Sequence, residues 1–376
     1  MIRNPIGTRR FRFRVPRFLM LATLVASGGC GESTSEPAQP ADDDIMVLNS
    51  TGQTLAAFSV SETVAASGAP VDLGAGFDGD RVDLTAAFAV TTVSSFGGSR
   101  VLFVDLSSGS LSTSFFPAPE GDLANPSAAS FDAQGIAWVG GRGSDAVYRL
   151  MPGDTLAESI AREVGTFVER VLPVGERLFV VDANIDDDGG SYEPLGPGRI
   201  VVLSRTGVEL QIIDLPPGAF NPTEGVVWGS DMIVLAAGTF DSATFLPAND
   251  GALVVVDLEA GTTGPLLALE ANGVSLEPGA DGFVYVSTTA DFQTLNLLRF
   301  DPASGDFARG PADPIPVVGG AGRRVDCWAA TALADGRIVC VTFSFAESGR
   351  LVVASAGGSF IHEVASGFGT TDLALR

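Results

Sequence analysis

The sequence contains no lysine, one histidine and three cysteines in 376 residues, which limits the sites it can build. The single histidine, His362, excludes metal centres that need two or more imidazole ligands. All 22 cationic residues are arginine and they face 45 acidic residues, for a formal net charge of −23. Nucleic acids and anionic lipid surfaces are bound by concentrated Lys and Arg, so the composition argues against both as partners.

Long hydrophobic runs are also missing, since no apolar stretch approaches the roughly 20 residues of a spanning helix. The apolar run Phe18–Ala26 follows an arginine-rich start and precedes the small residues Ser27–Gly29. This order predicts a secretion signal over residues 1–29. This segment contains six arginines and no acidic residue, so the rest of the chain has 16 Arg and 45 acidic residues and a formal charge near −29.

The end of this segment resembles the signal of bacterial lipoproteins, in which a Cys after small residues carries the lipid. Cys30 is the matching residue. Ser27 stands where the family prefers an aliphatic residue, so ordinary cleavage beside an incidental Cys is the alternative. The resemblance implies a membrane-anchored protein of the outer membrane, facing the periplasm or the cell surface, because Gly31 rather than Asp follows the Cys. Residues 30–44 are small, polar and acidic, and are predicted to form a flexible tether.

Composition sets the fold class of residues 45–376. Hydrophobic residues make up 45% of the chain and charged residues 18%, with 46 Gly and 22 Pro. This is too apolar for disorder and too rich in turn residues for a helical bundle, so we predict one all-β domain.

Short β-branched runs recur along this domain at intervals of about 43 to 57 residues, the span of a four-stranded propeller blade. There are seven runs: Ile45–Leu48, Val101–Val104, Ala146–Tyr148, Ile200–Leu203, Leu253–Val256, Leu295–Phe300 and Leu351–Val353. Most lead into a turn that starts with Asp, Asn or Ser and ends with Gly, as in Asp257–Gly261. Such turns favour tight hairpins, here between the third and fourth strands of a blade.

A second hairpin signal precedes five of the runs and predicts the connection between first and second strands. It occurs at residues 131–139, 174–180, 228–234, 278–286 and 333–339. At Phe283–Val286 and Ile338–Val341 the chain resembles the YVTN-repeat and NHL-type β-propellers. The resemblance implies a ring, which we predict to be seven-bladed and closed by the C-terminal strand pairing with the N-terminal blade. A six-bladed ring is the alternative, because residues 68–92 match an ordinary strand pair poorly.

The first strands of a propeller line its channel, so polar residues near their starts are the candidate ligands. These are Asn125, Glu169, Asn221, Glu224, Asn272, Asp326 and Asp372. A ring of carboxylates and amides can hold a divalent cation, as in the lactonase-type propellers that the fold also resembles.

A separate acidic loop begins at Asp182, a further candidate ligand, and matches the front of a calcium-binding loop at Asn184, Asp186 and Asp188. The match is partial, since Leu195 stands where a bidentate Glu belongs. A solvated loop between strands is the alternative, so Ca²⁺ is the only cofactor that the sequence suggests.

Two cysteines remain after Cys30. Cys327 and Cys340 are predicted on the first two strands of one blade, where they form either a disulfide or two buried thiols. A turn at Asp335-Gly336 places Thr331 opposite Cys340. His362 falls in a late, outer strand, far from any shared cleft.

No constellation in the sequence amounts to a catalytic signature, so no catalytic residue is assigned. The favoured hypothesis is a monomeric, membrane-tethered binding or scaffolding platform for a protein or glycan partner. A Ca²⁺-dependent lactonase- or lyase-type enzyme with its site in the channel is the second hypothesis, and a structural envelope protein is the third. The inserts at Asp182–Pro197 and Thr239–Asn249 are predicted to lie on one face, as a recognition surface.

Overall fold

The computed structural model describes residues 44–61, 63–74, 81–94, 98–118, 121, 124–186, 193–241, 243–344 and 346–376. The signal, Cys30 and the tether lie outside these residues. The described residues form mainly β-strands. None of their segments is a helix long and apolar enough to cross a membrane. The all-β prediction is confirmed.

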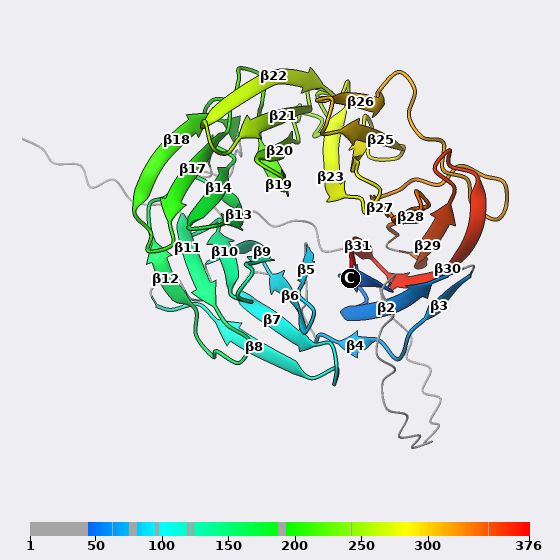
Figure 1. Cartoon of the computed structure of the whole chain (residues 1–376), viewed down its shortest axis with the longest axis horizontal. Helices are drawn as coiled ribbons and strands as arrows, with labels where there is room; N and C mark the ends of the chain where they lie inside the picture. The colour runs from blue at the N-terminus through cyan, green and yellow to red at the C-terminus, as the bar shows by residue number, and fades with distance from the viewer. Residues whose placement is uncertain are drawn as a thin grey trace, which may run out of the picture.

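The strands form sheets arranged side by side around a central axis, which defines a β-propeller (Figure 1). Four sheets have four strands each, in chain order from the axis outward. They are β5–β8 (Val82–Leu84, Phe88–Val93, Arg100–Asp105, Leu111–Phe115), β19–β22 (Pro222–Trp228, Asp231–Ala236, Ala252–Asp257, Thr262–Ala268), β23–β26 (Asn272–Pro278, Val284–Thr289, Leu295–Asp301, Asp306–Arg309) and β27–β30 (Ala329–Ala332, Ile338–Val341, Ser348–Ala354, Phe360–Phe368).

An eight-stranded sheet continues the ring between β8 and β19. It consists of β9–β12 (Pro126–Phe131, Ala137–Gly141, Ala146–Leu150, Glu158–Ala161) and β13, β14, β17 and β18 (Val168–Val174, Arg177–Asp182, Arg199–Ser204, Glu209–Asp214). A single parallel pair, Ala128 with Arg170, joins the two halves at the axis. A small hairpin of β15 and β16 (Ile185–Asp186, Glu193–Pro194) belongs to the insert before β17.

The ring closes through the two ends of the described chain. The C-terminal β31 (Thr370–Leu375) pairs antiparallel with β1 (Asp44–Asn49), which also pairs with β2 (Thr54–Val60). The outer strands β3 (Val64–Ala66) and β4 (Val71–Asp72) both pair with β2. The expected closure by the C-terminal strand is therefore present, with β31 innermost.

The run Ile45–Leu48 differs from its predicted position. The sequence analysis places it in a third strand, like the other six runs, but β1 is the second strand of its sheet. The turn Asn49–Gly52 consequently joins second and third strands rather than third and fourth. All six residues of β1 are buried, which suits a strand covered on both edges by β31 and β2.

The turn chemistry follows the sequence prediction elsewhere. In the turn after β21, the Asp257 carboxylate accepts a hydrogen bond from the Glu259 N–H at 2.9 Å, and Gly261 has a φ of 66°. The turns after β7 and β25 repeat this arrangement with Asp105 and Asp301. All five predicted hairpins between first and second strands are also confirmed.

The core lies between neighbouring sheets rather than within one layer. One buried cluster, for example, joins Phe179 and Val202 of the β13–β18 half-sheet to Met232 and Val254 of the next sheet. Because each sheet buries both faces, apolar residues lie on both faces of the second strands, as in Met232–Ala236 of β20.

Candidate functional site

The centre of the ring holds a buried cluster of charge around Arg81, which immediately precedes β5. Its guanidinium forms ion pairs with Glu224 of β19, Glu277 of β23 and Asp372 of β31. The Arg81 Nη1 to Asp372 Oδ1 distance is 2.8 Å. One cation thus contacts carboxyl groups from three different sheets.

The same carboxylates also accept backbone hydrogen bonds from neighbouring inner strands. Asp372 Oδ2 accepts from the Val82 N–H at 2.8 Å, and Glu224 Oε2 accepts from the Leu276 N–H at 3.1 Å. Each bond crosses from one sheet to the next. The Arg81 cluster (Arg81, Glu224, Glu277 and Asp372) therefore ties the inner strands of neighbouring sheets together at the axis.

Burial of the cluster perturbs one of its carboxyls strongly. The pKa of Glu277 is raised from its ordinary value of 4.5 to about 8, because burial penalises the charged form more than Arg81 stabilises it. The charge of Asp372 raises the pKa of Glu277 further.

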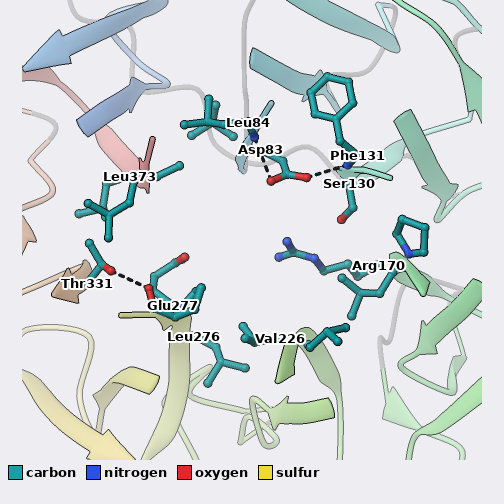
Figure 2. A pocket seen from close by; sticks show the side chains of 18 residues that line it. Asp83, Leu84, Ser130, Phe131, Arg170, Val226, Leu276, Glu277, Thr331 and Leu373 are labelled. Atoms are coloured by element: carbon teal, nitrogen blue, oxygen red, sulfur yellow. Dashed lines mark hydrogen bonds between the residues drawn. The ribbon is translucent and has the colours of Figure 1, made fainter. Parts of the chain in front are cut away.

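A cavity of about 350 Å³ lies beside this cluster on the axis of the ring (Figure 2). Residues of β5, β9, β13, β19, β23, β27 and β31 all line it, among them Asp83, Arg170 and Glu277. Leu172, Val226 and other apolar side chains form the remaining walls. The cavity therefore combines apolar side chains with charged and other polar groups.

Asp83 sits on one wall of the cavity with both oxygens engaged. Its Oδ2 accepts from the Phe131 N–H at 2.7 Å and its Oδ1 from the Leu84 N–H at 2.9 Å (Figure 2). Burial raises the pKa of Asp83, although the Phe131 hydrogen bond and the charge of Arg170 oppose the shift. The carboxylate is thus compensated largely by backbone N–H groups.

Two of the seven predicted channel residues, Glu224 and Asp372, meet in the Arg81 cluster. The other five lie elsewhere along the inner strands. Glu169 pairs with Arg142, at 2.6 Å from Nη2 to Oε2, and Asp326 accepts from the Leu295 N–H at 3.1 Å. Asn125 and Asn221 have positive φ values of 44° and 51° where the chain enters β9 and β19.

Asn272 holds an insert in place. Its Nδ2 donates to the Thr239 carbonyl at 2.8 Å and its Oδ1 accepts from the Asn249 N–H at 2.9 Å. These are the two ends of the insert predicted at Thr239–Asn249, which lies between β20 and β21. Asn272 thus fixes the base of a surface loop.

The acidic loop at Asp182 uses its first carboxylate for structure. Asp182 Oδ1 accepts from the N–H groups of Thr166, Phe167 and Asn184, while Arg199 Nε donates to Oδ2 at 2.7 Å. Asn184 donates to the Pro197 carbonyl at 2.9 Å. Asp186 lies in β15, and Asp188 lies outside the described residues. Within the described residues, no three His, Cys, Asp or Glu side chains are arranged to hold a metal ion.

The two remaining cysteines are bonded, with a Cα–Cα distance of 5.5 Å between Cys327 and Cys340. The predicted register is wrong by one residue, because Ala330 and not Thr331 lies opposite Cys340. The hairpin closes with the Leu333 N–H bonded to the Arg337 carbonyl, so its loop is one residue longer than the predicted turn. His362 lies in the outermost strand β30, as expected, opposite Val353.

The sequence analysis missed Arg81, Asp83, Arg170 and Glu277. Charged residues within otherwise apolar inner strands were the available signal, and Arg170 between Val168 and Val171 is the clearest case. Arg81 lies in residues 68–92, the stretch that matched the repeat poorly.

A second feature is a group of exposed apolar side chains, the apolar rim, formed by Phe240, Phe245, Leu246 and Phe292. Their exposed fractions are 46%, 71%, 50% and 54%. The first three belong to the insert between β20 and β21, and Phe292 to the loop between β24 and β25. The Phe240 and Phe292 rings stack with centroids 5.8 Å apart. Loops from two adjacent sheets therefore build one apolar surface.

Comparisons with known proteins support the fold and leave the function open. No protein-family model matches the sequence, and no curated protein matches it significantly. The structure is similar to a protein from Lactobacillus plantarum (13% identity, TM-score 0.60, covering 88% of this chain and 98% of that one). It is also similar to hydrazine synthase from Kuenenia stuttgartiensis, with 12% identity and a TM-score of 0.57 over 78% of this chain and 88% of that one. A third similar structure is a dihydro-heme d1 dehydrogenase in complex with DHE, with 12% identity and a TM-score of 0.55 over 91% of this chain and 77% of that one. At these identities the likeness concerns the propeller fold alone.

Arg81→Gln is expected to lower the free energy of unfolding by about 3–5 kcal/mol, because it leaves the buried carboxylates of Glu224 and Asp372 without their cation. Urea unfolding measures the loss. Arg149→Gln is the matched control, since it breaks an exposed pair with Glu158 and is expected to cost about 0–1 kcal/mol. Equal stability of Arg81→Gln and the parent chain would contradict the role of the cluster.

The raised pKa of Glu277 predicts how the stability of the folded protein changes with pH. Between pH 4.5 and about 8 the folded protein keeps a proton on Glu277 that the unfolded chain has lost. Its contribution to stability therefore falls as the pH rises through this window. Glu277→Gln is expected to flatten the decline of the urea midpoint across this range, whereas Glu209→Gln on the exposed strand β18 is expected to leave it unchanged. An unaltered slope in Glu277→Gln would refute the assignment.

Proposed function

We propose that this chain is an exported, seven-bladed β-propeller that captures a partner protein through the apolar rim. A lipid on Cys30 would tether the monomer to the outer membrane, facing the periplasm or the cell surface, with residues 30–44 as the spacer. The exposed stack of Phe240 on Phe292 carries the proposal, because exposed apolar surface of this kind marks interaction sites.

The count of seven treats the two halves of the eight-stranded sheet as separate blades. Two observations support it. The halves share only one parallel residue pair, and buried clusters occur between every pair of neighbouring blades in the described chain. Strands of all seven blades also reach the central cavity.

The backbone at the rim supports a role in binding. Phe245 and Phe292 adopt positive φ values of 58° and 60°, which are unfavourable for bulky side chains. Neither ring is buried, so no gain in core packing offsets the strain. Strained residues of this type concentrate at functional sites.

Both loops of the rim are held by hydrogen bonds and are therefore preorganised. The Asp241 carboxylate accepts from the Ala243 and Thr244 N–H groups at 3.0 and 2.7 Å. Asp291 likewise accepts from the Gln293 and Thr294 N–H groups, at 2.8 and 2.7 Å. Rigid loops lose little conformational entropy on binding, which favours affinity.

The exposed acids of these two loops, Asp241 and Asp291, define the partner chemistry. Because they flank the apolar side chains and carry negative charge, we expect a partner segment with apolar residues beside Arg or Lys. The Arg81 cluster argues against the alternative of a Ca²⁺-dependent enzyme using Glu224 and Asp372, because these carboxylates already neutralise an arginine of the chain.

Site-specific photo-cross-linking in membranes of the producing cell tests the proposal. A photo-reactive residue at position 245 is expected to trap one partner, whereas the same residue at position 210, on exposed strand β18, is expected to trap none. Excess parent protein should compete with trapping, and a Phe240→Ser/Phe292→Ser variant should not. Phe245→Gly should leave stability unchanged or raise it by up to about 1 kcal/mol, because it relieves the positive φ. Identical trapping at both positions would overturn the proposal.

A further inference from the structure

Arg170 differs from the other central arginine in having no direct partner. Its Nε is buried and makes no hydrogen bond within the described residues, and no carboxylate oxygen there lies at ion-pair distance from it. Arg81 by contrast contacts three carboxylates. The buried Arg170 charge is therefore left uncompensated by contact within the described residues, which is costly unless something binds it.

The Arg170 side chain faces an open volume. Figure 2 shows its guanidinium reaching into the middle of the central cavity, between Asp83 and Glu277. Asp83 bonds to backbone N–H groups and Glu277 to Arg81, and neither forms an ion pair with Arg170. Burial and the nearby charge of Arg81 both lower the pKa of Arg170, as expected of a cation without a contacting anion.

We propose that the central cavity binds a small organic carboxylate with an apolar body, held by Arg170. A guanidinium presents two parallel N–H donors that match a carboxylate. The apolar walls, including Phe131, Leu172 and Val226, suit an aromatic or aliphatic group. A volume of about 350 Å³ limits the ligand to small molecules. This site is separate from the apolar rim and does not depend on partner capture there.

The strong negative charge of the protein does not prevent such binding. The acids nearest the cavity have other contacts: Glu224, Glu277 and Asp372 share the single cation Arg81, and Asp83 accepts two backbone hydrogen bonds. Over distances beyond about 8 Å, salt screens the exposed acids at physiological ionic strength. At the end of the Arg170 side chain, the charge of Arg81 adds to that of Arg170, whereas Asp83, Asp372 and an ionised Glu277 act against a bound anion. Below about pH 8 the proton on Glu277 removes one of these opposing charges.

Calorimetric titration of the full chain with benzoate tests the site, with benzamide as a neutral probe of the same shape. Benzoate is expected to bind once per chain with a dissociation constant of about 1 mM or tighter. Benzamide should bind at least about ten-fold more weakly, because it lacks the charge that pairs with Arg170.

Variants of two arginines separate this site from general charge effects. Arg170→Gln is expected to weaken benzoate by about ten-fold or more, and Arg170→Lys by less, because the ammonium keeps the charge but loses the paired donors. Arg299→Gln is the matched control. Its Nε is also buried without a partner, but its guanidinium lies over the Phe283 ring, 4.5 Å from the centroid. Circular dichroism and thermal unfolding check that each variant is folded.

Three results would overturn the proposal: no saturable binding of benzoate, equal binding by Arg170→Gln and the parent, or equal affinity for benzamide. If acetate binds as tightly as benzoate, the claim that the cavity walls recognise the apolar body of the ligand is overturned, since Arg170 would then bind any small anion. Loss of binding in Arg170→Gln alone supports it, whatever the outcome of cross-linking at the rim.

Discussion

Each sheet of this ring buries both of its faces against neighbouring sheets, so the arrangement is complete only when the last sheet meets the first. The chain achieves this by giving its C-terminal strand to the sheet that begins the domain, where β31 pairs with β1 along five residue pairs. The same strand supplies Asp372, which bonds to Arg81 and to the Val82 N–H of the next sheet. Closure therefore fixes both the pairing of the two innermost strands of this sheet and the charge cluster at the axis.

The distribution of charge separates two regions of the molecule. At the axis, acids from several sheets meet arginines, and nearly every charge there has a partner. Among the described residues Arg170 has no contacting partner, and it faces a cavity. On the loops between second and third strands, acids bond their own backbone and leave apolar rings exposed. The axis is thus suited to a small ligand and the loops to a macromolecule.

Local features of the fold could be predicted from the sequence. The hairpins of Asp257–Gly261 and Asp335-Gly336 depend on side-chain and backbone preferences within a few residues, so their positions follow from the sequence pattern. Their fine register does not, as the one-residue error opposite Cys340 shows. The disulfide itself was one of two predicted alternatives.

The central site could not be predicted in the same way. Arg81 meets Asp372 across 291 residues and Glu277 across 196, and these separations carry no periodic signal. Which inner-strand residues face one another depends on how the sheets pack around the axis. Glu224 and Asp372 were found because they begin first strands, whereas Asn125 and Asn221, chosen by the same rule, serve the entry turns.

Removal of residues 370–376 tests ring closure most directly. We expect the truncated chain to lose its cooperative urea transition, because β1 loses its partner strand β31 and Arg81 loses Asp372 at the same time. A synthetic peptide of residues 369–376 should restore the transition in a concentration-dependent manner. A truncated chain that unfolds at the same urea concentration as the parent, with or without the peptide, would show that the ring does not depend on closure by β31.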